Sequence, residues 1–115
     1  MNSVKVLCVE HTSEYLEAMK EMLETAGYDV VCATTGRQGM NELTNNAIQG
    51  VLLEYDLPDM SGAFVKDEMK RIKPDVPVLL FSGIGGQTPF MLRFFDSYVR
   101  KGNAASRGFR ELEER

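Results

Sequence analysis

Residues 51–58 have the sequence Val-Leu-Leu-Glu-Tyr-Asp-Leu-Pro, an apolar run that leads directly into two acids. The apolar run before Glu54 predicts a short strand that is buried on both faces. Glu54 then stands at the carboxyl end of that strand, which is the end where ligands bind in open parallel α/β sheets. We therefore expect Glu54 to lie in a functional site.

The same alternation of apolar strands and amphipathic helices runs through the whole chain. Further strands are predicted at residues 4–9, 29–33, 76–81 and 98–100, and helices at residues 12–26, 35–43, 61–72, 89–95 and 104–115. The expected inward residues of the helix at 61–72 are Phe64, Val65, Met69 and Ile72. Strict alternation of five strands and five helices predicts a flavodoxin-like α/β fold, with three layers (α/β/α) and a five-stranded parallel sheet.

Length and composition favour one domain, spanning residues 1–115, in a soluble protein. The net charge of −4 gives no reason to expect binding to nucleic acid or to an anionic membrane. No apolar run approaches the roughly 20 residues that a membrane span needs, and the first residues lead into a strand without a signal peptide. A cytoplasmic location is expected. Cys8 and Cys32 lie in apolar runs, and we expect two buried, reduced thiols rather than a redox or zinc site.

Polar side chains follow four of the predicted strands. The first strand ends at Glu10 and His11, the third at Glu54, the fourth at Ser82 and the fifth near Lys101. Any one of them alone fits a solvated strand end. Since the carboxyl ends of parallel strands meet at one edge of the sheet, the set together predicts a site that combines acids, a hydroxyl group and an ammonium group.

With these residues in place, the chain resembles a receiver domain of two-component response regulators (CheY-like) over essentially its whole length. The segments that carry the resemblance are residues 6–11, 26–30, 52–54, 77–83 and 98–101, together with Leu57, Pro58 and Gly62. The resemblance implies the strand order 2-1-3-4-5. It also implies an aspartate that accepts a phosphoryl group at the end of the third strand, beside a bound magnesium ion. A hydroxyl group, a lysine and an aromatic residue then act as the switch, and they match Ser82, Lys101 and Tyr98.

The matched site departs from the family at three places, one of which is Gly102, where the family commonly has a proline after the lysine. Glu54 stands where the family has the acceptor aspartate, and its carboxylate reaches about 1.5 Å further. Glu10 and His11 stand where the family has two metal-binding acids, so an imidazole replaces a hard oxygen ligand that magnesium prefers. Asp56 is a further acid that can line the same pocket. The predicted acidic pocket thus consists of Glu10, His11, Glu54 and Asp56. If magnesium binds there, its expected ligands are Glu10, Glu54 and Asp56.

These departures lead to three hypotheses. The first is a non-enzymatic pseudo-receiver that needs no cofactor, in which Glu54 imitates the charged state by contacting Lys101 and Ser82. The second is a conventional magnesium-dependent receiver that still accepts a phosphoryl group, on Glu54 or Asp56, from a histidine kinase. The third, from another class, is a flavodoxin-like module that binds a nucleotide or flavin, and only the glycine-rich residues 83–86 favour it.

An apolar segment after the fourth strand predicts an interaction surface. Its members are Phe90, Met91, Phe94 and Phe95, with Tyr98 on the following strand. Tight packing onto the sheet is the alternative for this segment, whereas exposure would mark an interface. We expect a protein partner, either a histidine kinase or a downstream effector. A homodimer through the face of the fourth helix, fifth strand and fifth helix is a further expectation. An effector domain could follow the charged residues 104–115 in a longer chain.

Overall fold

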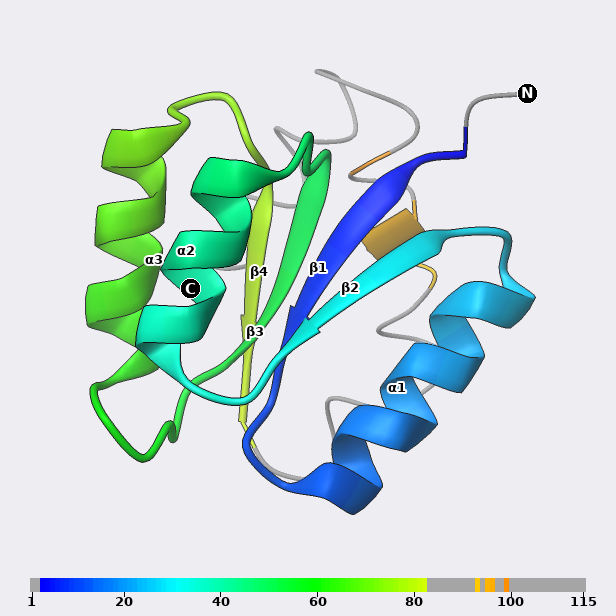
Figure 1. Cartoon of the computed structure of the whole chain (residues 1–115), viewed down its shortest axis with the longest axis horizontal. Coiled ribbons are helices and arrows are strands. Elements are labelled where there is room, and N and C mark those ends of the chain that lie inside the picture. The colour runs from blue at the N-terminus through cyan, green and yellow to red at the C-terminus, as the bar shows by residue number, and fades with distance from the viewer. Residues whose placement is uncertain (1–2, 83–92, 94, 97–98, 100–115) are drawn as a thin grey trace.

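The computed structural model describes residues 3–82, 93, 95–96 and 99, and a parallel sheet lies at its centre (Figure 1). The four strands of the described part are β1 (Lys5–Val9), β2 (Asp29–Ala33), β3 (Gly50–Glu54) and β4 (Val78–Phe81). They follow the order β2-β1-β3-β4, and every pair is parallel. These strands therefore confirm the predicted fold class and the predicted order as far as the fourth strand.

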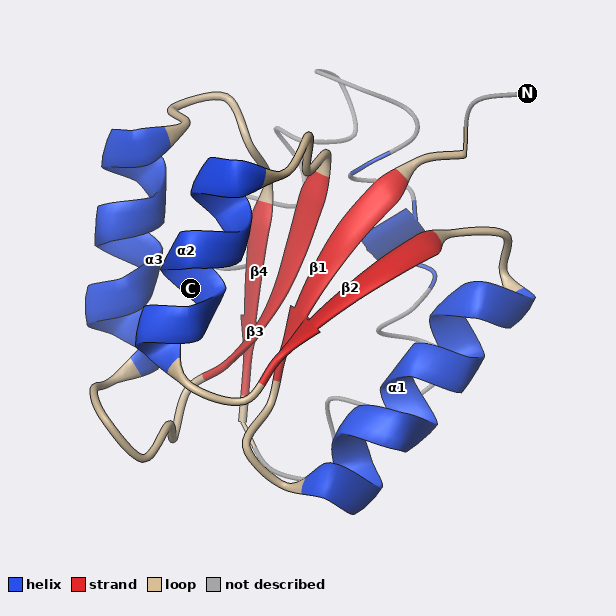
Figure 2. Cartoon of the chain, viewed as in Figure 1, coloured by secondary structure: helices blue, strands red, loops and turns tan. Residues whose placement is uncertain are grey.

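In the described part of the chain, three helices cover the two faces of this sheet (Figure 2). Helix α1 (Ser13–Thr25) lies on one face, and α2 (Gly36–Asn45) and α3 (Gly62–Ile72) lie side by side on the other. Each helix connects two parallel strands, which need a long crossover because their ends lie at opposite edges. Within the described part of the chain, no helix has both the length and the apolar character needed to cross a membrane.

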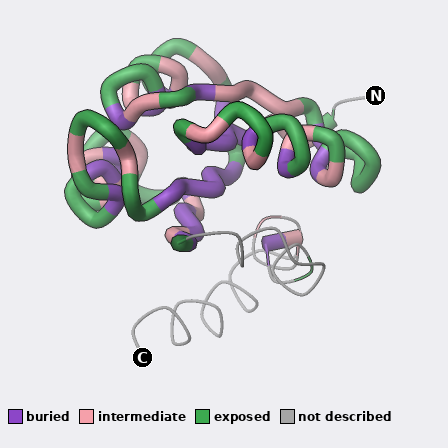
Figure 3. Tube along the Cα trace, turned by 90° about the horizontal axis from the view of Figure 1, so that it is seen from below, coloured by how far each residue is buried: buried purple, intermediate pink, exposed green. Residues whose placement is uncertain are grey.

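The two central strands are buried on both sides, as their continuous apolar sequences predict (Figure 3). Side chains of β1 alternate between the two faces: Cys8 packs into the cluster beneath α1, and Leu7 and Val9 pack into the cluster beneath α2 and α3. All five residues of β3 are buried. Glu54 is the last residue of this strand, and the burial of the strand fixes the position of the Glu54 backbone.

Side chains at the helix starts satisfy the first amides of two helices. The hydroxyl of Thr35 accepts a hydrogen bond from the Gln38 amide at the start of α2, at 3.1 Å. The hydroxyl of Ser61 accepts one from the Phe64 amide at the start of α3, at 3.2 Å. After α1, Gly27 takes a φ of 97°, a conformation that favours glycine and ends the helix.

The predicted inward face of α3 is wrong at two of its four residues. Val65 and Met69 are fully buried, but Phe64 is 51% exposed and Ile72 is 40% exposed. Because successive helical residues are about 100° apart, the stripe that Val65 and Met69 define leaves Phe64 on the flank of the helix. Apolar character alone did not distinguish the buried stripe from its border.

Beyond Ser82, the described residues Arg93, Phe95, Asp96 and Val99 are helical. Phe95 and Val99 pack into the cluster beneath α1. Phe95 is completely buried, with its ring edge-to-face against Tyr28 at a centroid distance of 5.8 Å, and the Tyr28 hydroxyl donates to Asp96 at 2.5 Å. The prediction of Phe95 as an interface residue is therefore wrong for this chain, and tight packing holds at that position.

The predicted fifth strand is also wrong at Val99, which is helical. Val99 packs against Gly50 at the start of β3, where a Cβ atom would lie only 2.6 Å from a Val99 methyl group. The missing side chain of Gly50 thus makes room for Val99. Residues 98 and 100 lie outside the described residues, as does the predicted helix at 104–115.

The two cysteines lie in register on adjacent strands, Cys8 on β1 and Cys32 on β2. Both are free thiols; Cys8 is buried and Cys32 is half-buried. Burial raises the pKa of both thiols, and the neighbouring Cys32 raises that of Cys8 further. Since the thiolate is the reactive form, these shifts favour the structural interpretation of both cysteines.

Candidate functional site

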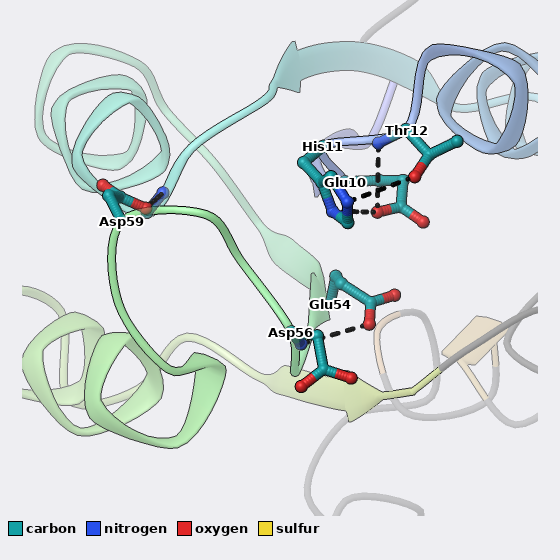
Figure 4. Close-up of polar contacts among 7 residues, drawn as sticks. Glu10, His11, Thr12, Glu54, Asp56 and Asp59 are labelled. Atoms are coloured by element: carbon teal, nitrogen blue, oxygen red, sulfur yellow. Dashed lines mark hydrogen bonds and ion pairs between the residues drawn. The ribbon is translucent and has the colours of Figure 1, made fainter.

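Two buried glutamates meet at the carboxyl edge of the sheet. Glu10 directly follows β1 and Glu54 ends β3, and the two strands are neighbours with Val9 opposite Leu53. The register therefore places Glu10 beside Glu54, as the close-up shows (Figure 4). Their exposed fractions are 1% and 3%, and they are the two buried charged residues among those described. Carboxylates are rarely buried without a partner, so this pair marks a site.

One oxygen of Glu54 has a partner and the other does not. Oε1 accepts a hydrogen bond from the backbone amide of Asp56 at 3.1 Å. Oε2 is inaccessible to solvent and has no hydrogen-bond partner among the described residues. A buried charged group without a partner is unfavourable. Oε2 would therefore be stabilised either by a cationic hydrogen-bond donor or by protonation of the carboxylate.

Glu10 has weak partners and a like charge nearby. Its Oε2 lies 3.5 Å from Nδ1 of His11 and accepts from the Thr12 amide at 3.5 Å. Burial raises the pKa of the Glu10 carboxyl, and the charge of Glu54 raises it further, against smaller opposing effects from Thr12 and His11. The pair therefore concentrates negative charge at the edge of the sheet.

Replacing Glu10 by glutamine should stabilise the protein at neutral pH, because burial and the charge of Glu54 make the ionised carboxyl of Glu10 less favourable in the native state than in the unfolded chain. A raised pKa means that the native state binds the proton more tightly than the unfolded chain. Wild-type stability should therefore fall as pH rises from the ordinary glutamate pKa, about 4.3, through the raised pKa of Glu10, and Glu10→Gln should reduce this slope. Urea unfolding across this pH range measures both effects.

The matched control for this prediction is Glu14→Gln, which removes an exposed glutamate from the first turn of α1. Since this variant keeps both Glu10 and Glu54, the fall in stability with rising pH should remain. An unchanged slope in Glu10→Gln as well would show that Glu10 does not carry the repulsion.

The remaining acidic-pocket residues, His11 and Asp56, lie further out. Both are exposed, and the Asp56 carboxylate points away from Glu10 (Figure 4). Together with Ser61 and the loop residues that follow β3, they line an open pocket of about 420 Å³. The structure thus divides the predicted acidic pocket into a buried pair, Glu10 and Glu54, and an outer rim that contains His11 and Asp56.

The predicted switch and interface residues fall mostly outside the described residues. Ser82 is described, exposed and directly follows β4. Its neighbour Phe81 pairs with Glu54 in the sheet, so Ser82 lies close to the end of β3. The residues outside the description are Phe90, Met91, Phe94, Tyr98 and Lys101.

One residue near the site has a role that the sequence interpretation missed. Asp59, in the loop after β3, accepts hydrogen bonds from the amides of Gly36 and Arg37 at 2.8 and 3.0 Å. Although desolvation opposes the shift, these hydrogen bonds lower the pKa of the Asp59 carboxyl. The available signal was indirect: the first turn of α2 contains no acidic residue of its own, so its positive end was free for an acid from elsewhere.

Comparison with known proteins agrees with this geometry. The sequence profile of the response regulator receiver domain family matches residues 6–98. The transcriptional regulatory protein PrrA of Mycobacterium tuberculosis is 27% identical over 82 residues, which are 71% of this chain and 35% of PrrA. The chain therefore spans about a third of the length of that relative.

Solved structures show the same fold at low identity. A receiver domain protein from Methanospirillum hungatei has a TM-score of 0.70 at 20% identity, covering 98% of this chain and 93% of its own. A response regulator from Burkholderia pseudomallei has a TM-score of 0.66 at 17% identity, covering 70% of this chain and 48% of its own. That second protein was solved with a phosphorylated aspartic acid, a calcium ion and citrate.

Proposed function

The chain belongs to the response regulator receiver domain family, and we propose that it is a pseudo-receiver that works without phosphorylation. In this proposal Glu54 supplies a permanent negative charge at the position of the phosphoacceptor. The domain has no enzymatic activity of its own and acts through contacts with other proteins.

The observation that carries the proposal is the burial of the Glu54 carboxylate. A phosphoryl donor must reach the attacking oxygen in line, and most of the catalysis in phosphoryl transfer is positioning. Here one oxygen is held by the Asp56 amide and the other is shielded from solvent. A carboxylate placed in this way is poorly positioned to attack a donor but is already a buried negative charge.

The unpartnered oxygen of Glu54, Oε2, is available to accept a hydrogen bond from a switch residue. The resemblance to the family matches Lys101 to the switch lysine and Ser82 to the switch hydroxyl. We propose that the Lys101 ammonium, outside the described residues, donates to Oε2 as it would to a phosphoryl group; the exposed Ser82 hydroxyl makes no hydrogen bond to this oxygen in the structure. A carboxylate carries one negative charge, against about −1.5 to −2 for a phosphorylated side chain. Glu54 therefore reproduces only part of the charge of a phosphorylated residue.

The residues present fit a magnesium site poorly. Magnesium prefers hard oxygen ligands in a near-octahedral arrangement. No three metal-binding side chains converge within the described part of the chain. Glu10 and Glu54 are close together, but the imidazole of His11 faces Glu10 and the Asp56 carboxylate points away. We therefore propose a site that works without a metal ion or another cofactor.

The proposed partners are proteins: a histidine kinase or a downstream effector. The chain spans about a third of the length of PrrA. The regulatory role of a longer protein that contained this domain is therefore also a proposal. We keep the homodimer through the fourth helix, fifth strand and fifth helix as a proposal. The proposed members of this face are Phe90, Met91, Phe94 and Tyr98, because Phe95 belongs to the core.

Magnesium titration followed by NMR tests the proposal against the second candidate, a conventional receiver. That candidate is favoured by one observation, the meeting of two carboxylates at the end of the sheet. We expect the amide signals of Glu10, Glu54 and Asp56 to stay in place as magnesium is added.

The control in this titration is Glu54→Gln, which keeps the length of the side chain and removes its charge. Shifts that persist in this variant are due to general ionic effects. Saturable shifts at Glu10, Glu54 and Asp56 in the wild type, absent from Glu54→Gln, would support the conventional receiver.

A further inference from the structure

The Glu54 side chain is hydrogen-bonded to the first part of the loop after β3, residues 55–61. Oε1 of Glu54 accepts the amide hydrogen of Asp56, two residues further along the chain, at 3.1 Å. An ionised acceptor makes this hydrogen bond stronger than one between neutral groups. The position of Asp56 is therefore tied to the carboxylate of Glu54.

The two ends of this loop are fastened to each other. Asp56 and Ser61 form an isolated antiparallel bridge, and the Gly62 amide donates to the Tyr55 carbonyl at 2.7 Å. Gly62 also lies so close to β3 that a Cβ atom would collide with the Glu54 carbonyl oxygen and with Cα of Tyr55. A shift at Asp56 is thus expected to move the loop as a unit rather than be absorbed within it.

A residue later in the same loop, Asp59, is hydrogen-bonded to the first turn of α2. Asp59 accepts hydrogen bonds from the Gly36 and Arg37 amides, one with each carboxylate oxygen (Figure 4). Met60 packs against Gly36 so closely that a Cβ atom there would lie 2.8 Å from the Met60 side chain. The first amides of α2 therefore depend on an acid that belongs to this loop.

From these contacts we propose that Glu54 controls the order of the first turn of α2 through the loop at residues 55–61. Glu54 holds Asp56, the bridge between Asp56 and Ser61 transmits its position, and Asp59 carries it to the amides of Gly36 and Arg37. The inference deepens the proposed function, on which it rests, by naming α2 as an element that the hydrogen bond between Glu54 and Asp56 holds in place.

Amide hydrogen exchange measured by NMR on the full chain tests this coupling. Glu54→Met removes the acceptor for the Asp56 amide and keeps a side chain of similar length, without a buried charge. It should speed exchange at the Gly36 and Arg37 amides about fivefold, the effect of losing one helix-capping interaction. Glu54→Gln is the matched control, because its amide oxygen still accepts from Asp56, and exchange at both positions should stay near the wild-type rate.

The decisive comparison is a double-mutant cycle with Asp59→Ala. Asp59→Ala alone should speed exchange at Gly36 and Arg37, and adding Glu54→Met should have no further effect there. The amide of Val51, bonded to the Pro77 carbonyl in the sheet, reports global stability. An equal effect of Glu54→Met with and without Asp59, an equal effect at Val51, or no effect at Gly36 would overturn the proposal.

A reciprocal measurement covers the case in which Glu54→Met does not fold. Coupling between two positions acts in both directions, so Asp59→Ala should also speed exchange at the Asp56 amide. Unchanged exchange at Asp56 would contradict the coupling. None of these readouts involves magnesium or a phosphoryl group, so the coupling can fail while the pseudo-receiver stands, or hold while the chain proves to accept a phosphoryl group.

Discussion

The double variant Glu54→Asp, His11→Asp should take up one phosphoryl group from acetyl phosphate in the presence of magnesium. The substitution at position 54 withdraws the carboxylate by about 1.5 Å, one carbon–carbon bond, from the buried position that Glu54 holds. The substitution at position 11 supplies a hard oxygen ligand beside Glu10, which magnesium prefers to an imidazole. Since positioning accounts for most of phosphoryl-transfer catalysis, we expect the effect to be large, from no uptake to nearly stoichiometric uptake in intact mass.

The matched control is Glu54→Asp with His11→Asn, which shortens the acceptor without adding a charged ligand. It should take up much less than the double aspartate variant. If the double aspartate variant kept its unmodified mass while remaining folded, the loss of phosphoryl transfer would not originate at positions 54 and 11.

Replacing Lys101 by methionine should lower the free energy of unfolding by about 3–5 kcal/mol, the cost of removing one partner of a buried ion pair. In the proposed site, the loss of Lys101 leaves the carboxylates of Glu10 and Glu54 buried together without a cation. This is a large part of the roughly 5–15 kcal/mol that stabilises an ordinary domain, so urea unfolding will resolve it. Adding Glu54→Gln should recover most of the loss, because the neutral side chain needs no counter-charge.

Lys5→Met is the control for that prediction. Lys5 forms an exposed ion pair with Asp29 at 3.9 Å, and such pairs contribute less than about 1 kcal/mol. A loss in Lys101→Met no larger than in Lys5→Met, or equal losses with and without Glu54→Gln, would show that Lys101 is not the partner of Glu54.

The placement of Glu10 and Glu54 followed from the sequence because sheet geometry leaves little freedom. Two continuous apolar runs predicted buried parallel strands, and parallel strands bring their carboxyl ends to one edge. Neither step requires knowledge of how the helices pack. The burial of both carboxylates follows from the same register, since the residues beside them in the strands are fully buried.

Other features depend on packing between distant segments, which local patterns do not report. Phe64 and Val65 are adjacent apolar residues, and only the angle at which α3 lies on the sheet decides which is buried. Asp59 binds amides 22 and 23 residues earlier in the chain. Val99 has the β-branched character of a strand residue, yet it is helical and fills the space above Gly50.

Phe95 illustrates the same difficulty for a predicted interface. A run of large apolar residues indicates that a segment is covered, but not by what. In this chain Phe95 is covered by the core beneath α1 and by the ring of Tyr28. Sequence alone offers the same signal for an internal contact and for a contact with a partner.

The most direct test of the central claim is the intact mass of the wild-type chain after incubation with acetyl phosphate and magnesium. Our expectation is an unmodified mass, because Glu54 acts as a fixed charge. A stoichiometric gain of one phosphoryl group, stable in acid, released by hydroxylamine and abolished in Glu54→Gln, would contradict it.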